Sequence, residues 1–347
     1  MPLLSDAELS NLRIEQSVFH IVGPGNEHFK LLEAFDAGPY APFFLGRIAS
    51  VNGGNRYVFL DDSPVHTQLK RISDEPAAFQ IESEKLATAF NEAHGGATAI
   101  GAFLLFALAC PGGQVFALLK FEDEKVLSYA FKEGRFGRPA PTFGEIERTF
   151  VQNRNALQKA ALIRLGGDED QVFVIDRQNP QRPAAYFERF LHVRRKRNEG
   201  ELTQTIIQLA RKVVLKHKNL LPPEALKALS QRLFDASESG GTVDGERPDD
   251  WFMSVVGPLP EDSPALKAFR AELKREGMAG ESFNLEKGSL TPPRNRRVET
   301  ASGIKVVFPA TLQKSVISID EVNGEILIRD QILLNDVDLE TSNRSRS

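Results

Sequence analysis

The sequence is almost devoid of cysteine. Cys110 is the only one among 347 residues, so an internal disulfide cannot form. It follows the apolar run at 103–109, a setting that favours a buried and unreactive thiol. Both features favour a protein that works in a reducing compartment and needs neither disulfide bonds nor a thiol nucleophile.

Long apolar stretches are also absent. Nowhere do about 18 apolar residues run together, the length that a membrane-spanning helix needs. Residues 1–6 lack the basic and apolar segments of a secretory signal. We therefore expect a cytoplasmic protein with no membrane partner.

Motifs that carry chemistry are missing as well. No phosphate-binding loop is present, and Gly-Pro-Gly at 23–25 lacks the third glycine of a dinucleotide fingerprint. The histidines are not paired at helical zinc-site spacing, and there is no nucleophile elbow. The carboxylate clusters at 61–62, 168–170 and 249–250 are interpreted as solvated turns. We predict no catalytic residue, no cofactor and no metal site.

What the sequence does have is an uneven distribution of charge. The net charge is −4, yet the segment from Arg177 to Lys218 has eleven basic residues against three acidic ones. That segment is +8, so the remainder of the chain sums to −12. Lysines and arginines that neutralise phosphates supply most of the sequence-independent affinity for DNA. The segment is therefore the candidate nucleic-acid-binding region.

The spacing within this segment suggests a basic helical patch. If residues 182–196 form one helix, Arg182, Arg189 and Lys196 lie on a single face. Because surface charges contribute little to stability, replacing Arg194, Arg195 and Arg197 with alanine is expected to leave the fold intact. An ordinary solvated helix face remains open as the alternative. The nominated nucleic-acid contacts are Arg182, Arg189, Arg194, Arg195, Lys196, Arg197, Arg211 and Lys212.

The first half of the chain is predicted to be rich in strands. Two near-continuous apolar runs, joined by Cys-Pro-Gly-Gly at 110–113, predict a hairpin in the middle of a sheet. Other patterns predict strands at 17–22, 42–48, 56–60 and 172–175, with helices at 75–93 and 145–165.

The second half is predicted to be helical and then to return to strands. Helices are expected at 182–196, 201–216, 222–234 and 264–276, a loop at 237–250, and strands at 304–308, 315–319 and 325–328. Asn323-Gly324 predicts a tight hairpin between the last two. The predicted fold class is α+β, with a C-terminal β-hairpin that returns to pack on the rest. The expected regions are a β-rich α+β domain at 1–176, a helical and locally basic region at 177–280, a β segment at 281–335 and a disordered tail at 336–347.

Two stretches have a recognisable pattern. One combines Val-Phe-Val-Ile-Asp at 172–176 with Ala-Tyr-Phe-Glu-Arg-Phe-Leu at 185–191 and Thr-Ile-Ile-Gln-Leu-Ala at 205–210. The other is Ser-Gly-Ile-Lys-Val-Val-Phe-Pro at 302–309, followed by the hairpin at 317–328. In these stretches the chain resembles the bacterial nucleoid-associated NdpA family. The resemblance implies location at the nucleoid and double-stranded DNA as a partner, without specifying residues.

Charge and resemblance together favour a non-enzymatic, nucleoid-associated protein that contacts DNA phosphates with little regard for sequence. A competing hypothesis is a protein-interaction or accessory component, for example of a defence system, with little direct DNA binding. A metal-dependent nuclease built on Glu-Asp-Glu-Lys at 122–125, which we interpret as a charged turn, is a distant third. A protein partner and a homodimer are left open.

Truncation tests the predicted tail. Removing residues 336–347 should cost almost no stability, because the segment is poor in apolar side chains that could dock on a core. Thermal unfolding of the full and shortened chains gives the comparison. A clear fall in melting temperature would show that the tail is docked.

Overall fold

The computed structural model describes residues 2–331 apart from 95–98, 123, 134–138, 150–156, 167, 168, 294, 314, 321 and 322. For the strands at 124–133 and 139–149 it describes the backbone alone. The predicted tail at 336–347 lies outside the described residues. The chain divides into two compact units, residues 1–290 and 291–347, and each is described by itself.

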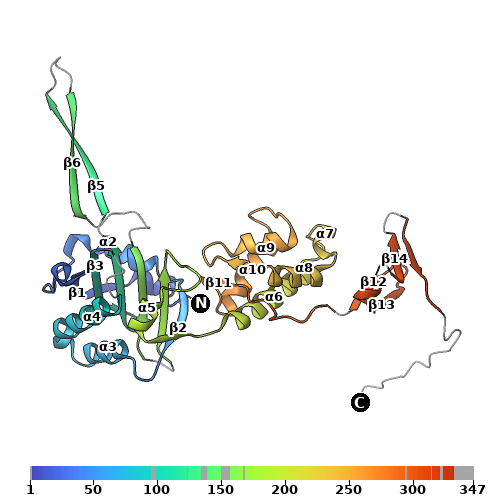
Figure 1. Ribbon diagram of the computed structural model, residues 1–347, viewed down its shortest axis with the longest axis horizontal. Coiled ribbons are helices and arrows are strands. Elements are labelled where there is room, and N and C mark those ends of the chain that lie inside the picture. Colours follow the sequence, from blue (N-terminus) through green and yellow to red (C-terminus); the bar gives the residue numbers. More distant parts are fainter. Residues whose placement is uncertain are drawn as a thin grey trace. The chain divides into compact units, whose positions relative to one another are not determined.

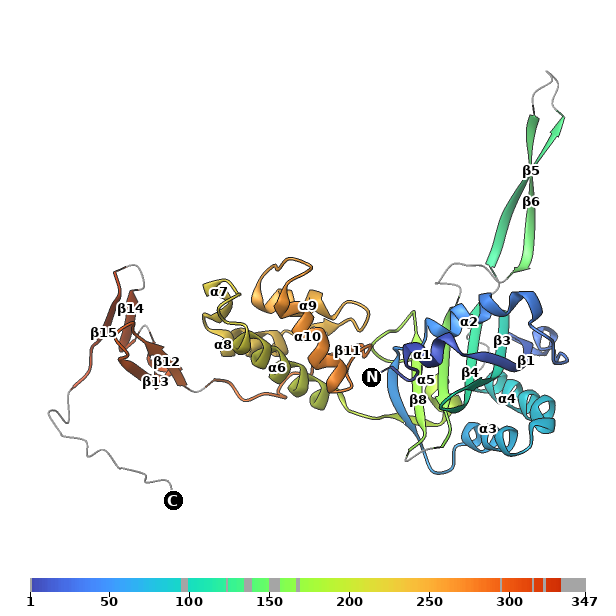
Figure 2. The same ribbon diagram turned by 180° about the vertical axis from the view of Figure 1, so that it is seen from behind.

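A seven-stranded antiparallel sheet organises the first part of the larger unit (Figures 1 and 2). The spatial order is β1-β3-β4-β7-β8-β2-β9, so β1 and β9 are the edge strands. The strands are β1 (Arg13–Val22), β2 (Asn55–Phe59), β3 (Gly101–Cys110), β4 (Gly113–Glu122), β7 (Leu157–Arg164), β8 (Gln171–Asp176) and β9 (Val193–Arg195). The predicted apolar hairpin is β3–β4, and its place in the middle of the sheet is confirmed.

Helices cover both faces of this sheet. One face packs against α3 (Pro64–Asp74), α4 (Phe79–His94) and α5 (Ala185–Leu191), with Phe90 buried against both Phe103 and Phe187. The other face packs against α2 (Ala41–Ala49), whose Phe44 contacts Phe106, and the short α1 (Asp6–Ser10) lies at its margin. Single 3₁₀ turns occur at Asn26–His28, Gly38–Tyr40, Pro76–Ala78 and Ala310–Leu312.

Two predicted elements in this part are wrong. Residues 42–48 belong to helix α2, where Phe44 and Ile48 are spaced four apart and both buried. The helix predicted at 145–165 is instead the end of β6 (Pro139–Thr149) and then β7. Strand β6 pairs with β5 (Glu124–Glu133) in a separate two-stranded sheet, inserted in the chain between neighbours β4 and β7.

A helical part with its own core follows β9. Its helices are α6 (Glu199–Lys216), α7 (Pro223–Leu226), α8 (Leu229–Glu238), α9 (Pro248–Val256) and α10 (Pro264–Arg275), joined by the small sheet of β10 (Thr242–Val243) and β11 (Phe283–Asn284). Phe252 and Phe269 stack in its core, together with Ile206 of α6. Helix α6 begins at a capping box, in which Asn198 and Glu201 each accept a hydrogen bond from the other's backbone N–H. Helix α9 begins inside the predicted loop 237–250.

The single helix predicted at 182–196 is also wrong. Helix α5 ends at Leu191, because His192 adopts a left-handed backbone conformation with φ 52°. Strand β9 follows at once and pairs with β2. Arg182, Arg189 and Lys196 therefore do not share a helix face.

The described part of the smaller unit contains two hairpins. One pairs β12 (Asn295–Glu299) with β13 (Lys305–Pro309), and the other pairs β14 (Ile317–Asp320) with β15 (Glu325–Ile328). The turn predicted at Asn323-Gly324 is confirmed, with Gly324 at φ 70°. The α+β class is confirmed by the sheet, the helical part and these hairpins taken together. Packing of the C-terminal strands on the rest of the chain stays a prediction.

A buried carboxylate fixes the end of β8. One oxygen of Asp176 lies 3.1 Å from Nζ of Lys159 and accepts a hydrogen bond from the N–H of Ala184. The other oxygen accepts hydrogen bonds from the N–H groups of Gln178 and Asn179. Because Ala184 directly precedes α5, one side chain connects the end of the strand to the start of the helix.

Asp176→Asn is expected to lower the free energy of unfolding by about 3–5 kcal/mol, since breaking a buried ion pair leaves Lys159 with an uncompensated charge. Asp36→Asn is the matched control, because Asp36 is exposed and accepts only a local hydrogen bond from Gly38. The control should change stability by less than about 1 kcal/mol. Urea unfolding of both variants gives the comparison, and equal losses would contradict the role assigned to Asp176.

Candidate nucleic-acid interface

The basic run at 194–197 lies where the seven-stranded sheet meets the helical part. Arg195, on edge strand β9, donates hydrogen bonds from Nη2 to the carboxylate of Glu281 at 2.9 Å and to the carbonyl of Ser282 at 2.7 Å. Its Nη1 donates to the carbonyl of Gln181 at 2.9 Å. The side chain of Glu281 is only 3% exposed, so Arg195 gives a buried carboxylate a hydrogen-bonded counter-charge.

Arg197 makes a second contact across the same junction. Its Nη2 donates a hydrogen bond to the carbonyl of Glu276, at the end of α10, at 2.9 Å. Arg56 of β2 lies close by, because a Cβ added to Gly277 would meet its guanidinium. Burial lowers the pKa of Arg56, with Glu281 acting in the opposite direction and Arg197 in the same one. A cation near a helix C-terminus is favourable, so this cluster also stabilises the end of α10.

Asn55 and Gly280 also join the sheet to the segment that follows α10. The side-chain amide of Asn55 donates a hydrogen bond to the carbonyl of Pro180 at 2.8 Å and accepts one from the N–H of Ser282 at 2.7 Å. A Cβ at Gly280 would lie 2.0 Å from the carbonyl oxygen of Gly53, and Gly280 has φ +84°. Only glycine satisfies both demands at this position.

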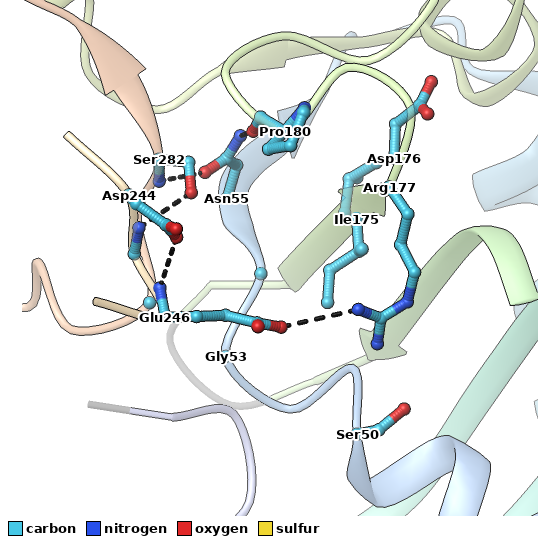
Figure 3. Close-up of a pocket in the computed structure, with 14 residues that line it drawn as sticks. Ser50, Gly53, Asn55, Ile175, Asp176, Arg177, Pro180, Asp244, Glu246 and Ser282 are labelled. Carbon is cyan, nitrogen blue, oxygen red and sulfur yellow. Dashed lines mark hydrogen bonds and ion pairs between the residues drawn. The ribbon is translucent and has the colours of Figure 1, made fainter. Parts of the chain in front are cut away.

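A pocket of about 350 Å³ opens beside this junction (Figure 3). Its walls come from the ends of β2 and β8 on one side and from the loops 244–246 and 280–282 on the other. Arg177 and Glu246 reach toward each other across it at 3.5 Å, as Figure 3 shows. The sequence offered no signal for the pocket, because its lining is assembled from segments far apart in the chain.

The eight nominated residues fall into three groups. Arg195 and Arg197 are held by the junction. Three more have carboxylate partners: Arg182 with Glu188, Lys196 with Glu169 and Lys212 with Glu272. The last group is Arg189, Arg194 and Arg211, which are exposed and form no side-chain ion pair with any residue that the structure describes.

Glu188 also ties α5 to the sheet. Its carboxylate accepts a hydrogen bond from the hydroxyl of Tyr57 at 3.1 Å. Burial first, and then Glu188, raise the pKa of Tyr57, so this hydroxyl stays a donor. The hydrogen bond to Glu188 raises the pKa of Arg182, whose own side chain is largely exposed.

Helix α10 carries cations that the sequence reasoning missed. Its exposed charged residues are Lys267, Arg270, Lys274 and Arg275, all basic. They lie three, four and one residues apart, a spacing that places them on one side of a helix. The sequence carries this signal at 264–276, outside the basic segment from Arg177 to Lys218.

Helix α10 connects the nominated cations of the run at 194–197 with those of α6. Glu272 accepts hydrogen bonds from both Lys212 of α6 and Arg275. Arg275 also lies 3.6 Å from the carboxylate of Glu276, whose carbonyl accepts the hydrogen bond from Arg197. The end of α10 thus lies between the run at 194–197 and the cations of α6.

Neither a metal centre nor a membrane segment is found in the described part of the chain. Its histidine, cysteine and acidic side chains form no group of three or more that could hold a metal ion. None of its helices combines the length and apolarity required to span a membrane. The nuclease hypothesis rests on residues 122–125, which are expected to form a charged turn. That expectation is wrong for Glu122 and Glu124, because they are the last residue of β4 and the first residue of β5. Asp123 lies outside the described residues.

Comparison with known proteins gives one match of large extent. The family model described as "Nucleoid-associated protein YejK" matches residues 44–335. This range takes in the helical part, both hairpins of the smaller unit and all eight nominated residues. No curated protein matches the chain.

Two neighbouring arginines provide a test of the junction. Arg195→Ala should lower the free energy of unfolding by about 2–4 kcal/mol, because it removes the hydrogen-bonded counter-charge of the buried Glu281 carboxylate. Arg194→Ala, one residue away on the exposed side of β9, should change it by less than about 0.5 kcal/mol. Urea unfolding followed by circular dichroism measures both. A stable Arg195→Ala variant would contradict the role given to the junction and restore the expectation that alanine at 194, 195 and 197 is harmless.

Proposed function

The chain belongs to the family of the nucleoid-associated protein YejK, and from this premise we propose that it acts at the bacterial nucleoid by contacting the phosphates of duplex DNA without a catalytic step. Family membership supports the location and the class of partner. The contact residues have to be argued from the charges themselves.

The observation that carries the proposal is the group of exposed cations without internal partners. Arg189, Arg194 and Arg211 form no side-chain ion pair within the described residues, so their donors are available to an external anion. Arg182, Lys196 and Lys212 have carboxylate partners but keep 76%, 46% and 49% of their side-chain surface exposed. An exposed ion pair is weak and exchanges readily for a phosphate contact.

A second candidate function is contact with another protein through the smaller unit. In residues 291–331 four large apolar side chains are about half exposed or more: Ile304, Val307, Leu327 and Ile328. Exposed apolar side chains on a small pair of hairpins favour a protein partner over a nucleic acid. This function predicts partner binding that persists when DNA is removed.

Salt dependence tests the DNA function. If about five cations reach phosphates, log K should fall against log[salt] with a slope of roughly −4 to −5, because each neutralised phosphate contributes about −0.9. The triple variant Arg189→Ala, Arg194→Ala, Arg211→Ala should flatten the slope by up to about 3 and keep the melting temperature. Retention of a labelled duplex over a salt series measures the slope for each protein, and thermal unfolding measures the melting temperature.

Two results would contradict the proposal in different ways. If the unaltered chain fails to retain DNA even at low salt, where phosphate contacts are strongest, direct DNA binding is wrong and the protein-contact function takes its place. If it binds but the triple variant keeps the full slope, the DNA-binding surface lies elsewhere.

A further inference from the structure

The exposed charged side chains of α10 are all basic. Lys267, Arg270, Lys274 and Arg275 are exposed, and they are the only exposed charged residues of the helix, all of which is described. The one acid of α10, Glu272, is only 13% exposed and accepts hydrogen bonds from Lys212 and Arg275. We call these four cations the α10 face.

The helix dipole does not account for the α10 face. Cations in the last turn are favoured by the C-terminal carbonyls, and this explains Lys274 and Arg275. The dipole effect fades within one turn, whereas Lys267 lies in the first half of the helix and Arg270 just past its middle, both before the last turn. Arg270 pairs with Asp249 of α9, yet its side chain remains 49% exposed.

Other basic side chains lie next to the α10 face. Lys212 of α6 reaches it through the shared carboxylate of Glu272, and Arg197 reaches its C-terminal end through the carbonyl of Glu276. The cations on either side are those that the charge pattern of the sequence nominated. We call the α10 face, together with Lys212 and the run at 194–197, the basic track; the carboxylate of Glu276, 42% exposed, lies beside Arg275 at the end of the helix.

We propose that the α10 face is the central docking surface for the sugar-phosphate backbone of duplex DNA, an inference that rests on the proposed function. Lys267 and Lys274 are seven residues apart, which is about 10 Å along a helix. One strand of a duplex advances about 3.4 Å per phosphate along the duplex axis, so a helix parallel to that axis would span roughly three phosphates over this distance. The rigid helix presents its cations at a spacing that a regular duplex can meet.

The composition of the track favours a duplex over a single strand. Proteins that hold single strands without sequence preference stack bases on exposed aromatic side chains. Strand β9 and helix α6 contain no aromatic residue, and the only one in α10, Phe269, is fully buried. The track therefore offers phosphate contacts without a platform for unpaired bases.

The double variant Lys267→Ala, Lys274→Ala in the full chain tests this surface. Its salt slope for a labelled duplex should be flatter than that of the unaltered chain by about 2, because two phosphate contacts are lost. The control is Arg13→Ala, Lys30→Ala, which removes the same charge from two exposed residues in and beside β1, at the opposite edge of the sheet from β9. The control should keep the full slope, and both variants should melt with the unaltered chain.

The outcomes separate this inference from the proposed function. If the unaltered chain binds the duplex but the α10 double variant behaves like the control, the α10 face is not the docking surface and DNA binding itself stands. If an equal-length single strand, or polyglutamate, competes as well as the duplex, the assignment to a duplex backbone is wrong. No retention by the unaltered chain overturns the proposed function and this inference together.

Discussion

Glu281 has lost almost all contact with water, and the guanidinium of Arg195 donates the hydrogen bond that offsets the cost of this burial. An ionised carboxylate in this position would otherwise cost several kcal/mol, on the order expected for an unpaired buried charge. The pair joins the edge of the seven-stranded sheet to the segment that follows α10. The chain also passes directly from β9 into α6 at 196–198, so this pair, together with the contacts of Arg197 and Asn55, holds the helical part against the sheet. The positions of α6 and α10 beside the basic run follow from these contacts.

This constraint explains why charge counting located the region but misjudged some of its residues. A count along the sequence treats every arginine between Arg177 and Lys218 alike. Folding divides them: Arg195 and Arg197 donate their hydrogen bonds internally, whereas Arg194 points to solvent. The partner of Arg195 is 86 residues further along the chain, and nothing near 195 in the sequence announces a buried acid there. The cations of α10 were missed for the complementary reason, since the helix is short and its local charge is modest.

The sequence predicts the fold best where the pattern of apolar residues matches the burial of those residues in the structure. The β3–β4 hairpin is apolar throughout because both of its faces are covered, and its turn residues mark the reversal. Helix α6 was equally clear, with a polar cap and a regular apolar stripe. By contrast, a short apolar run such as Ala160–Ile163 fits a buried strand and a buried helix equally well. Pairing with β4 and β8 decides between them, and these partners are distant in sequence.

The choice between strand and helix at residues 193–195 also determines the chemistry of the interface. In a helix, the side chains of Arg194 and Arg195 would point about 100° apart, and both could lie on one exposed face. In strand β9 they point to opposite sides, as alternation in a strand requires. Arg195 thereby enters the junction and Arg194 remains at the surface. Pairing with Tyr57, Val58 and Phe59 sets the register of this three-residue edge strand. The register therefore determines that Arg195 makes the internal contacts of the junction and that Arg194 is exposed to solvent.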